Sequence, residues 1–250
     1  LLDLLPDEHL VYFGDTGRFP YGPKPAAQVR DYSVQITDVL LAQHVKMVVV
    51  ACNSASAAAL DVLRDRAGVP VIGVIEPGLR AAFRATRSGR VGVIGTVGTI
   101  GSGAYQRTAS ELAGDDVDLT CAACPGFVEF VEAGDVDSDQ VHILAERLLA
   151  PVIAAKVDTL VLGCTHYPLL ARTITDVVGP DVVLVSSADE TAFEVRATLD
   201  GVHRRPERRP EKGIEPPVRR FLTSGDVVTF RTLGARFLGP EVDAVEAWLW

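Results

Sequence analysis

Two short segments of the sequence carry a cysteine in a setting where its thiol can act as an acid or a base. They read VVVACNSASAAAL and LVLGCTHYPLL, with cysteines at Cys52 and Cys164. In each, an apolar strand-like run ends at the cysteine, and a helix-like pattern follows through small polar residues. Open α/β sheets bind ligands at the carboxyl ends of their strands, so both thiols are expected in a binding site. The free N–H groups of a helix start are expected to lower the pKa of each thiol.

Two thiols that face one cavity can invert a carbon centre. One thiolate removes a proton from one face of a substrate Cα, and one thiol delivers a proton to the opposite face. Such a reaction needs no cofactor, but the charge that develops on the substrate carboxylate must be stabilised by hydrogen-bond donors. Four polar residues beside the cysteines are predicted to supply them: Asn53, Ser54, Thr165 and His166.

The alternative for any free cysteine is burial as a small hydrophobic residue. That would be our interpretation of a lone cysteine. Two cysteines in matched turns, each followed by a polar residue, favour catalysis instead. The chain has only four cysteines, so a disulfide framework of the kind found in small secreted proteins is not expected.

The elements that must position these turns follow from the hydrophobic pattern. Short β-branched runs alternate with longer segments that have apolar residues at three- and four-residue spacing, which is typical of an α/β protein with parallel sheets. Several of the strands are continuous apolar runs, as buried parallel strands require. Strands are predicted at residues 10–13, 47–51, 71–75, 91–94, 118–121, 159–162, 182–185 and 219–223. Helices are predicted at residues 28–43, 54–66, 105–112, 139–154 and 169–178.

Composition limits the classes of function. The 250 residues have a formal net charge of −9 at pH 7, which disfavours nucleic acid or an anionic membrane as the main partner. No apolar run reaches the roughly 18 residues of a membrane span, and the opening LLDLLPDEHL carries acids where a signal peptide has basic residues. A cytoplasmic location is therefore expected. The oligomeric state is not determined by the sequence, and a homodimer stays open.

Three other signals are weaker. Cys121 and Cys124 have the spacing of a redox or zinc half-site, but a single such pair is poor evidence, and both are interpreted as structural; no metal site is predicted. The glycines of GVIGTVGTIGSG lack dinucleotide-loop spacing, so a substrate-facing hydroxyl loop is favoured. The segment at 201–217, which includes RRPERRPEKGIEPP, is interpreted as a solvated linker, although its arginines leave an acidic partner open.

Several motifs together resemble those of the glutamate racemases in the aspartate/glutamate racemase superfamily. ACNSAS and GCTHYP look like the family's two catalytic-cysteine motifs, and GDTGRFPYG looks like its substrate loop. IGTVGTI and CPGFVEFVEAG fit as well. The motifs occur in the family's order from about Leu5 to Leu222.

The resemblance implies roles for particular residues. Cys52 and Cys164 become the proton-transfer pair, with His166 and Glu132 as helpers of Cys164. It also implies cofactor-independent interconversion of L- and D-glutamate, with D-glutamate supplied for peptidoglycan in a bacterial cytoplasm. The residues implied to bind the substrate are Asp15, Pro20, Tyr21, Gly22, Asn53, Ser54, Thr96, Thr99, Thr165 and His166.

The family's architecture is likewise implied: two α/β domains related by a pseudo-twofold axis, with parallel sheets flanked by helices and the active site in the cleft between them. On this sequence the first domain is expected at 1–75 plus 186–250, and the second at 76–185. The pattern of strands and helices alone does not reveal that discontinuity.

One feature of the family has no counterpart. Family chains open with a strand and an Asp-Ser-Gly loop, whereas this sequence begins at LLDLLPDEHL, which resembles the helix after that loop. In the family the loop supplies an Asp that assists the first cysteine and a Ser that contacts the substrate. We therefore expect that the true start is missing, that neighbouring strands have unpaired edges, and that the chain as printed is weakly active or inactive.

Three functions are ranked on these grounds. A glutamate racemase comes first. A racemase for aspartate or another small amino acid comes second, since the two differ in pocket size. A catalytically degenerate binding protein of the same fold comes third.

Overall fold

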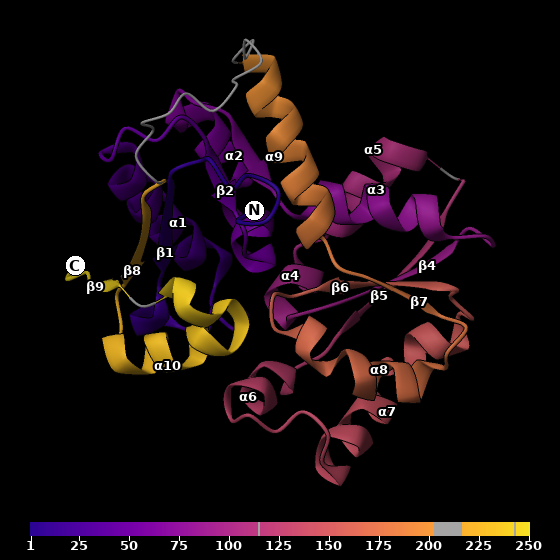
Figure 1. Cartoon of the computed structure of the whole chain (residues 1–250). Helices are drawn as coiled ribbons and strands as arrows, with labels where there is room; N and C mark the ends of the chain where they lie inside the picture. Colours follow the sequence, from indigo (N-terminus) through magenta and orange to yellow (C-terminus); the bar gives the residue numbers. More distant parts are fainter. Residues whose placement is uncertain (115, 203–216, 243) are drawn as a thin grey trace.

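The computed structural model describes residues 1–114, 116–202, 217–242 and 244–250. It confirms an α/β fold in which parallel sheets are flanked by helices, arranged as two units that lie side by side (Figure 1). The segment expected to be a linker, 201–217, lies outside the described residues apart from its ends.

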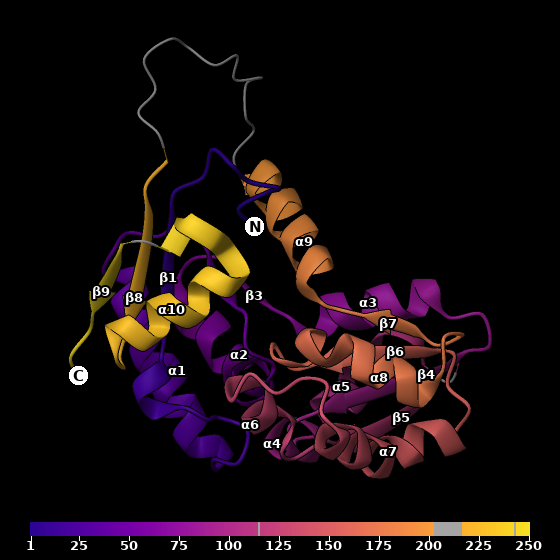
Figure 2. The same cartoon turned by 60° about the horizontal axis from the view of Figure 1, so that its bottom comes forward.

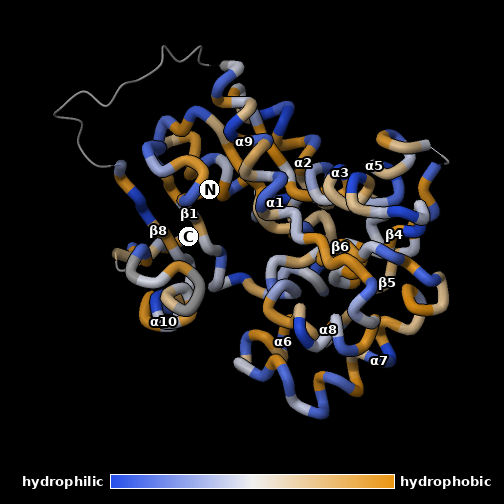
Figure 3. Tube along the Cα trace, turned by 45° about the vertical axis from the view of Figure 1, so that its right-hand side comes forward, coloured by the Kyte–Doolittle hydropathy of each residue, from blue (hydrophilic) through white to orange (hydrophobic). Residues whose placement is uncertain are grey.

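The second unit is built on one sheet of four parallel strands in the order β5-β4-β6-β7. Its strands are β4 (Arg90–Gly95), β5 (Asp118–Ala123), β6 (Thr159–Gly163) and β7 (Val183–Val185). The two central strands, β4 and β6, are almost wholly buried, as expected for a parallel sheet covered on both faces. Figure 3 shows hydrophobic residues along β6, while the surrounding helices carry both hydrophilic and hydrophobic residues.

Helices cover both faces of that sheet and enclose a hydrophobic cluster on each side. One cluster joins the sheet to α3 (Ile75–Ala85) and α5 (Ala104–Ala113). The other joins it to α6 (Phe127–Glu132), α7 (Asp139–Ala154), the 3-10 helix η2 (Tyr167–Leu170) and α8 (Ala171–Val178).

The first unit has two smaller parallel sheets. One has the order β1-β8-β9 and the other pairs β2 with β3. We expected unpaired strand edges in this unit, and within the described residues no ladder joins β1 to β2. The strands are β1 (Leu10–Gly14), β2 (Val48–Val50), β3 (Val71–Gly73), β8 (Arg219–Thr223) and β9 (Val245–Ala247). The helices are α1 (Ala26–Leu41), α2 (Asn53–Ala67) and α10 (Val227–Leu238).

Helix α9 (Ala188–Val202) contacts both units (Figure 2). It packs on α3 of the second unit and on β3 of the first. Val195 and Leu199 are buried against Ile72 of β3, with Leu5 beside them. The domain boundaries at 75/76 and 185/186 stay a prediction.

One predicted element is wrong at its end. The strand expected at 71–75 stops at Gly73, and α3 begins at Ile75. The apolar run VIGVI continues through the boundary, so its composition hides the change. The first turn of the helix contains Glu76 and Pro77, which are both well tolerated there.

The Asp158 carboxylate fixes the start of β6, at the opposite end of the strand from Cys164. Asp158 accepts hydrogen bonds from the Thr86 hydroxyl at 2.6 Å and from the backbone N–H groups of Arg87 at 2.9 Å and Ser88 at 2.7 Å. These bonds stabilise the charged form and hold the pKa of Asp158 well below its usual value.

Replacing Asp158 with asparagine should lower the free energy of unfolding at pH 7 by about 1–2 kcal/mol, because the amide nitrogen cannot accept these bonds. A carboxyl with a lowered folded pKa stabilises the protein fully above its unfolded pKa, and this stabilisation is lost as the pH falls toward the folded value. Urea unfolding at pH 7 and at pH 3.5 should therefore show a smaller difference between parent and variant at the lower pH. An equal difference in the free energy of unfolding at both pH values would contradict this account.

Candidate active site

Cys52 lies where β2 ends and α2 begins, as the N-cap residue of that helix. Its side chain is half-buried. Burial has the largest effect and raises the pKa of Cys52, although the backbone N–H groups of Ala55 and Ser54 at the helix start favour the thiolate.

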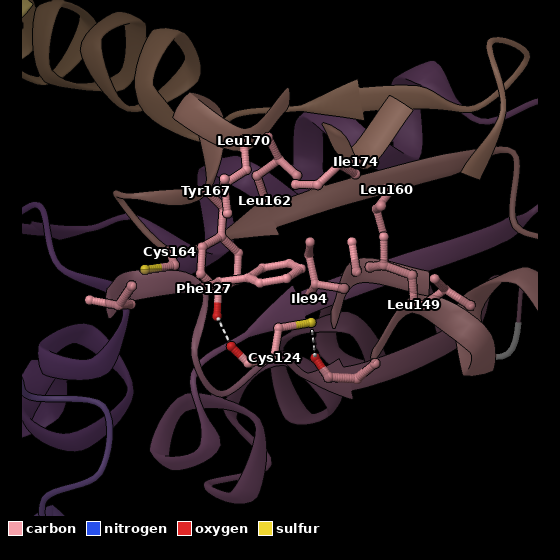
Figure 4. Close-up of a cluster of buried hydrophobic side chains, with 14 of the residues drawn as sticks. Ile94, Cys124, Phe127, Leu149, Leu160, Leu162, Cys164, Tyr167, Leu170 and Ile174 are labelled. Carbon is pink, nitrogen blue, oxygen red and sulfur yellow. Dashed lines mark hydrogen bonds between the residues drawn. The ribbon is translucent and has the colours of Figure 1, made fainter. Parts of the chain in front are cut away.

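Cys164 occupies the corresponding place after β6, just before η2. In Figure 4 its sulfur points away from the packed rings of Phe127 and Tyr167. Burial raises the pKa of Cys164 to about 12, although the backbone N–H of His166 opposes it. A charge on Cys52 raises this pKa further, so the two thiols are near enough to interact.

The expectation of lowered thiol pKa values is therefore wrong for the protein without a ligand. The helix-start N–H groups do favour both thiolates, but loss of water around the sulfur atoms costs more. Both cysteines are neutral thiols at neutral pH, and one of them must lose its proton to a nearby base before it can act.

Such a base lies beside Cys164. The Nδ1 atom of His166 is 3.8 Å from the Cys164 sulfur, and its Nε2 atom is 2.7 Å from a carboxylate oxygen of Glu132 at the end of α6. The His166 ring also lies 5.8 Å from the ring of Phe19, which belongs to the first unit. Sequence analysis named His166 and Glu132, and the structure brings them into one hydrogen-bonded chain. Phe19 was not identified from the sequence.

Three hydroxyls join the two units beside Cys52. Ser54 of α2 lies 3.0 Å from the hydroxyls of both Thr96 and Thr99, which are themselves 2.9 Å apart. Thr96 follows β4 and caps the short helix α4 (Val97–Gly101). Since Gly95 of β4 is in register with Gly163 of β6, Thr96 and Cys164 leave neighbouring strands at the same level. All three hydroxyls were predicted site residues.

Two further predicted donors differ in their surroundings. Asn53 is only 3% exposed, and its Oδ1 atom accepts a hydrogen bond of 2.8 Å from the hydroxyl of Tyr105. Thr165 is exposed and lies 3.4 Å from Nδ1 of His166. Tyr105 was assigned only to a helix, because a single aromatic residue in an apolar helical pattern is indistinguishable from an ordinary core residue.

In the predicted substrate loop, the Asp15 carboxylate accepts hydrogen bonds from several side chains. Asp15 accepts hydrogen bonds from the Arg18 side chain, from the Ser224 hydroxyl at 2.6 Å and from the Tyr21 hydroxyl. The guanidinium of Arg18 lies 3.7 Å from the ring centroid of Trp250. Asp15 thus anchors the loop that carries Pro20, Tyr21 and Gly22, and its oxygens are occupied by protein donors. The partners Ser224 and Trp250 are distant in sequence, and no pattern indicated them.

Gly22 allows this loop to touch the second unit. The backbone N–H of Gly98 donates to the Gly22 carbonyl at 2.9 Å. A Cβ atom at Gly22 would lie 2.7 Å from Cβ of Thr96, which is too close for two carbon atoms. The loop and the hydroxyl cluster can therefore lie together only with glycine at this position.

Replacing Gly22 with alanine should raise KM about tenfold, because the new methyl group must displace Thr96 from its hydroxyl partners. Steady-state kinetics with L-glutamate, the substrate that the family resemblance implies, will measure the change in KM. Gly101→Ala is the matched control, since a Cβ there, at the end of α4, meets nothing within 4 Å. Equal KM values for the two variants would contradict the proposed steric effect.

The cysteines at 121 and 124 belong to different packing environments. Cys121 packs with the cluster against α3 and α5, and Cys124 with the cluster against α7 and α8 (Figure 4). They therefore face opposite sides of β5. Among the residues that the structure describes, no group of three or more His, Cys, Asp or Glu side chains is suited to a metal ion. No helix in the described ranges is long and apolar enough to cross a membrane.

Comparison with known proteins gives a consistent result. The family model described as Asp/Glu/Hydantoin racemase matches residues 3–194. A glutamate racemase of Acidothermus cellulolyticus is 52% identical over 98% of this chain and 91% of its own length, and that of Mycobacterium leprae is 50% identical over 98% and 88%.

Solved structures agree. A glutamate racemase isoform from Bacillus anthracis has a TM-score of 0.91 at 38% identity and covers 99% of this chain and 90% of its own. The glutamate racemase of Francisella tularensis, solved in complex with D-glutamate, has a TM-score of 0.88 at 30% identity over 99% and 90%.

Proposed function

This chain belongs to the Asp/Glu/hydantoin racemase family, and we propose that it interconverts L-glutamate and D-glutamate with Cys52 and Cys164 as the two proton-transfer groups. The observation that carries the proposal is the matched placement of the two cysteines. Each follows a parallel strand at the start of a helical segment, and a charge on one thiol raises the pKa of the other. A small amino acid between them would present opposite faces of its Cα.

Proton transfer through Cys164 begins at its neighbouring histidine. His166 accepts the thiol proton at Nδ1 while Glu132 accepts a hydrogen bond from Nε2 and stabilises the resulting imidazolium. The Cys164 thiolate then removes the Cα proton, and the Cys52 thiol delivers its proton to the opposite face. The thiolate left on Cys52 is stabilised by the N–H groups of Ser54 and Ala55. The reverse reaction exchanges these roles.

The substrate's main carboxylate becomes enolate-like as the Cα proton leaves, so its donors determine the barrier. The hydroxyls of Ser54, Thr96 and Thr99 now bond to one another. Thr99 is fully buried and supports Ser54 and Thr96, whose hydroxyls are the ones proposed to rotate and donate to the carboxylate. The Asn53 amide lies beside them on the same helix as Ser54.

The test is circular dichroism at a fixed wavelength, with L-glutamate and D-glutamate supplied separately and aspartate in parallel. Both glutamate signals should converge to zero, and aspartate should change far more slowly. Faster conversion of aspartate would favour a racemase for another small amino acid. Binding of glutamate without any loss of optical activity would favour the degenerate binding protein.

The cellular role follows from the same family membership. We propose that the product, D-glutamate, is used for peptidoglycan and that the protein acts in the cytoplasm. Both proton-transfer groups are side chains, so the mechanism as written requires no cofactor. The structure of the Francisella tularensis relative with D-glutamate supports a small-molecule substrate.

A further inference from the structure

Tyr105 lies between the two cysteine turns and contacts both. It is a fully buried residue of α5 in the second unit. Its hydroxyl donates to Oδ1 of Asn53 at 2.8 Å, directly after Cys52. A Cβ atom added to Gly163, directly before Cys164, would lie 2.9 Å from the same hydroxyl oxygen. The hydroxyl therefore rests against the strand end that carries one cysteine and bonds to the residue that follows the other.

This contact determines which way the Asn53 amide faces. A side-chain amide has an accepting oxygen and a donating nitrogen that can exchange places by rotation. Burial raises the pKa of Tyr105, so its hydroxyl remains protonated and donates. A donor at this position selects the orientation with the amide oxygen toward Tyr105.

The opposite end of the amide then has an open direction. The described residues give Asn53 no other side-chain hydrogen bond, and its nitrogen is not among the buried polar atoms without a partner. The nitrogen therefore keeps some exposure, although Asn53 as a whole is only 3% exposed. It lies on the same helix turn as Ser54 and the hydroxyl cluster, where the proposed carboxylate would be held.

We propose that Tyr105 is a positioning residue that locks the Asn53 amide with its N–H groups toward the substrate carboxylate. This role rests on the proposed function, because it requires an anionic substrate beside Asn53. The alternative is a simple core role. The ring does pack among Leu79, Val91 and Val93, and phenylalanine would keep that packing while removing only the hydroxyl.

The experiment is a double-mutant cycle with Tyr105→Phe, Asn53→Ala and the double variant, measured as kcat/KM with L-glutamate and with D-glutamate. Tyr105→Phe in the parent should raise KM about threefold to tenfold, the effect of one lost hydrogen bond. In the Asn53→Ala background the same change should alter kcat/KM by less than about twofold, because the group that it orients is gone.

Thr173→Val is the matched control. It removes another buried hydroxyl, which donates to the Val136 carbonyl at 2.6 Å and not to either cysteine turn. It should lower the Tm as Tyr105→Phe does and leave KM unchanged.

The outcomes separate the two claims. An equal loss from Tyr105→Phe with and without Asn53 would overturn the positioning role and leave the racemase proposal intact. A rise in KM with Thr173→Val as large as that with Tyr105→Phe would also overturn it, since general loosening would then explain both. A folded parent protein that neither racemises nor binds glutamate would overturn the proposed function and this role with it.

Discussion

Replacing Cys164 with alanine is expected to lower kcat for glutamate racemisation about 10²- to 10⁴-fold in both directions, the range typical of a lost acid or base. Cys52→Ala should have a similar effect, because each turnover needs one group on each face of the Cα. Alanine is small enough to fit both positions, so the fold should be retained. Circular dichroism of the substrate measures racemisation, and that of the protein measures folding.

The two variants should also differ from each other in an informative way. Each keeps one thiol, which can still remove a proton from the enantiomer whose Cα–H faces it and return a deuteron to the same face. In D2O, each variant should therefore wash deuterium into only one enantiomer without inverting it, and the two variants should select opposite enantiomers. NMR at the Cα position will measure the exchange.

Cys121→Ala is the control for both. That thiol packs against α3 and α5 and is not part of the paired turns. Full racemisation by both single variants at Cys52 and Cys164 would exclude the two-thiol mechanism. Exchange of the same enantiomer by both would show that the thiols do not act on opposite faces.

The second large effect is expected at the base beside Cys164. His166→Asn should lower kcat about 10²-fold, because the thiol then has no partner to accept its proton. Glu132→Gln should cost about tenfold, since glutamine keeps the contact with Nε2 but supplies no charge. Both losses should be largest in deuterium wash-in from the enantiomer that Cys164 deprotonates.

The pH dependence of deuterium wash-in tests whether His166 accepts the proton of Cys164. Burial raises the pKa of Cys164 to about 12, so its neutral form dominates at lower pH and only the thiolate can act as the base. In His166→Asn, wash-in through Cys164 should rise continuously as the pH increases from 7 to 10, because hydroxide must replace the missing histidine. A pH profile identical to that of the parent would contradict the role of His166.

A second histidine offers a matched control. His142 of α7 lies 3.5 Å from the Asp176 carboxylate on the neighbouring helix α8. This pair resembles that of His166 and Glu132 in composition, but the partners of His142 are Asp176 and the Ser138 carbonyl rather than a cysteine. His142→Asn should leave both the rate and its pH dependence unchanged.

Much of the fold was predictable because its signals are local. The expected helix at 139–154 has the observed bounds of α7, and the strand at 219–223 has those of β8. The error at Ile75 arose where one apolar run continues from a strand into a helix, so that residue type no longer distinguishes the two. Helices α3, α9 and α10 were not predicted from the pattern.

In the candidate site, too, some residues were predictable from the sequence and others were not. Cys52, Cys164 and Ser54 were identifiable because they lie where an apolar strand ends, whereas Thr96 and Thr99 were assigned through the resemblance. Glu132 was named only through a resemblance, as it is 34 residues from the histidine that it contacts. Tyr105 and Ser224 were missed, since their contacts with Asn53 and Asp15 depend on how distant elements pack.

The sequence by itself determined the kinds of chemical group, their order along the chain, and the strand-to-helix turns that carry the thiols. These depend on neighbouring residues and on the repeat of apolar positions. Only the tertiary structure decided the protonation state of those thiols. The helix-start N–H groups are local and favour the thiolate, but desolvation depends on every atom packed around the sulfur, and here it is the larger effect.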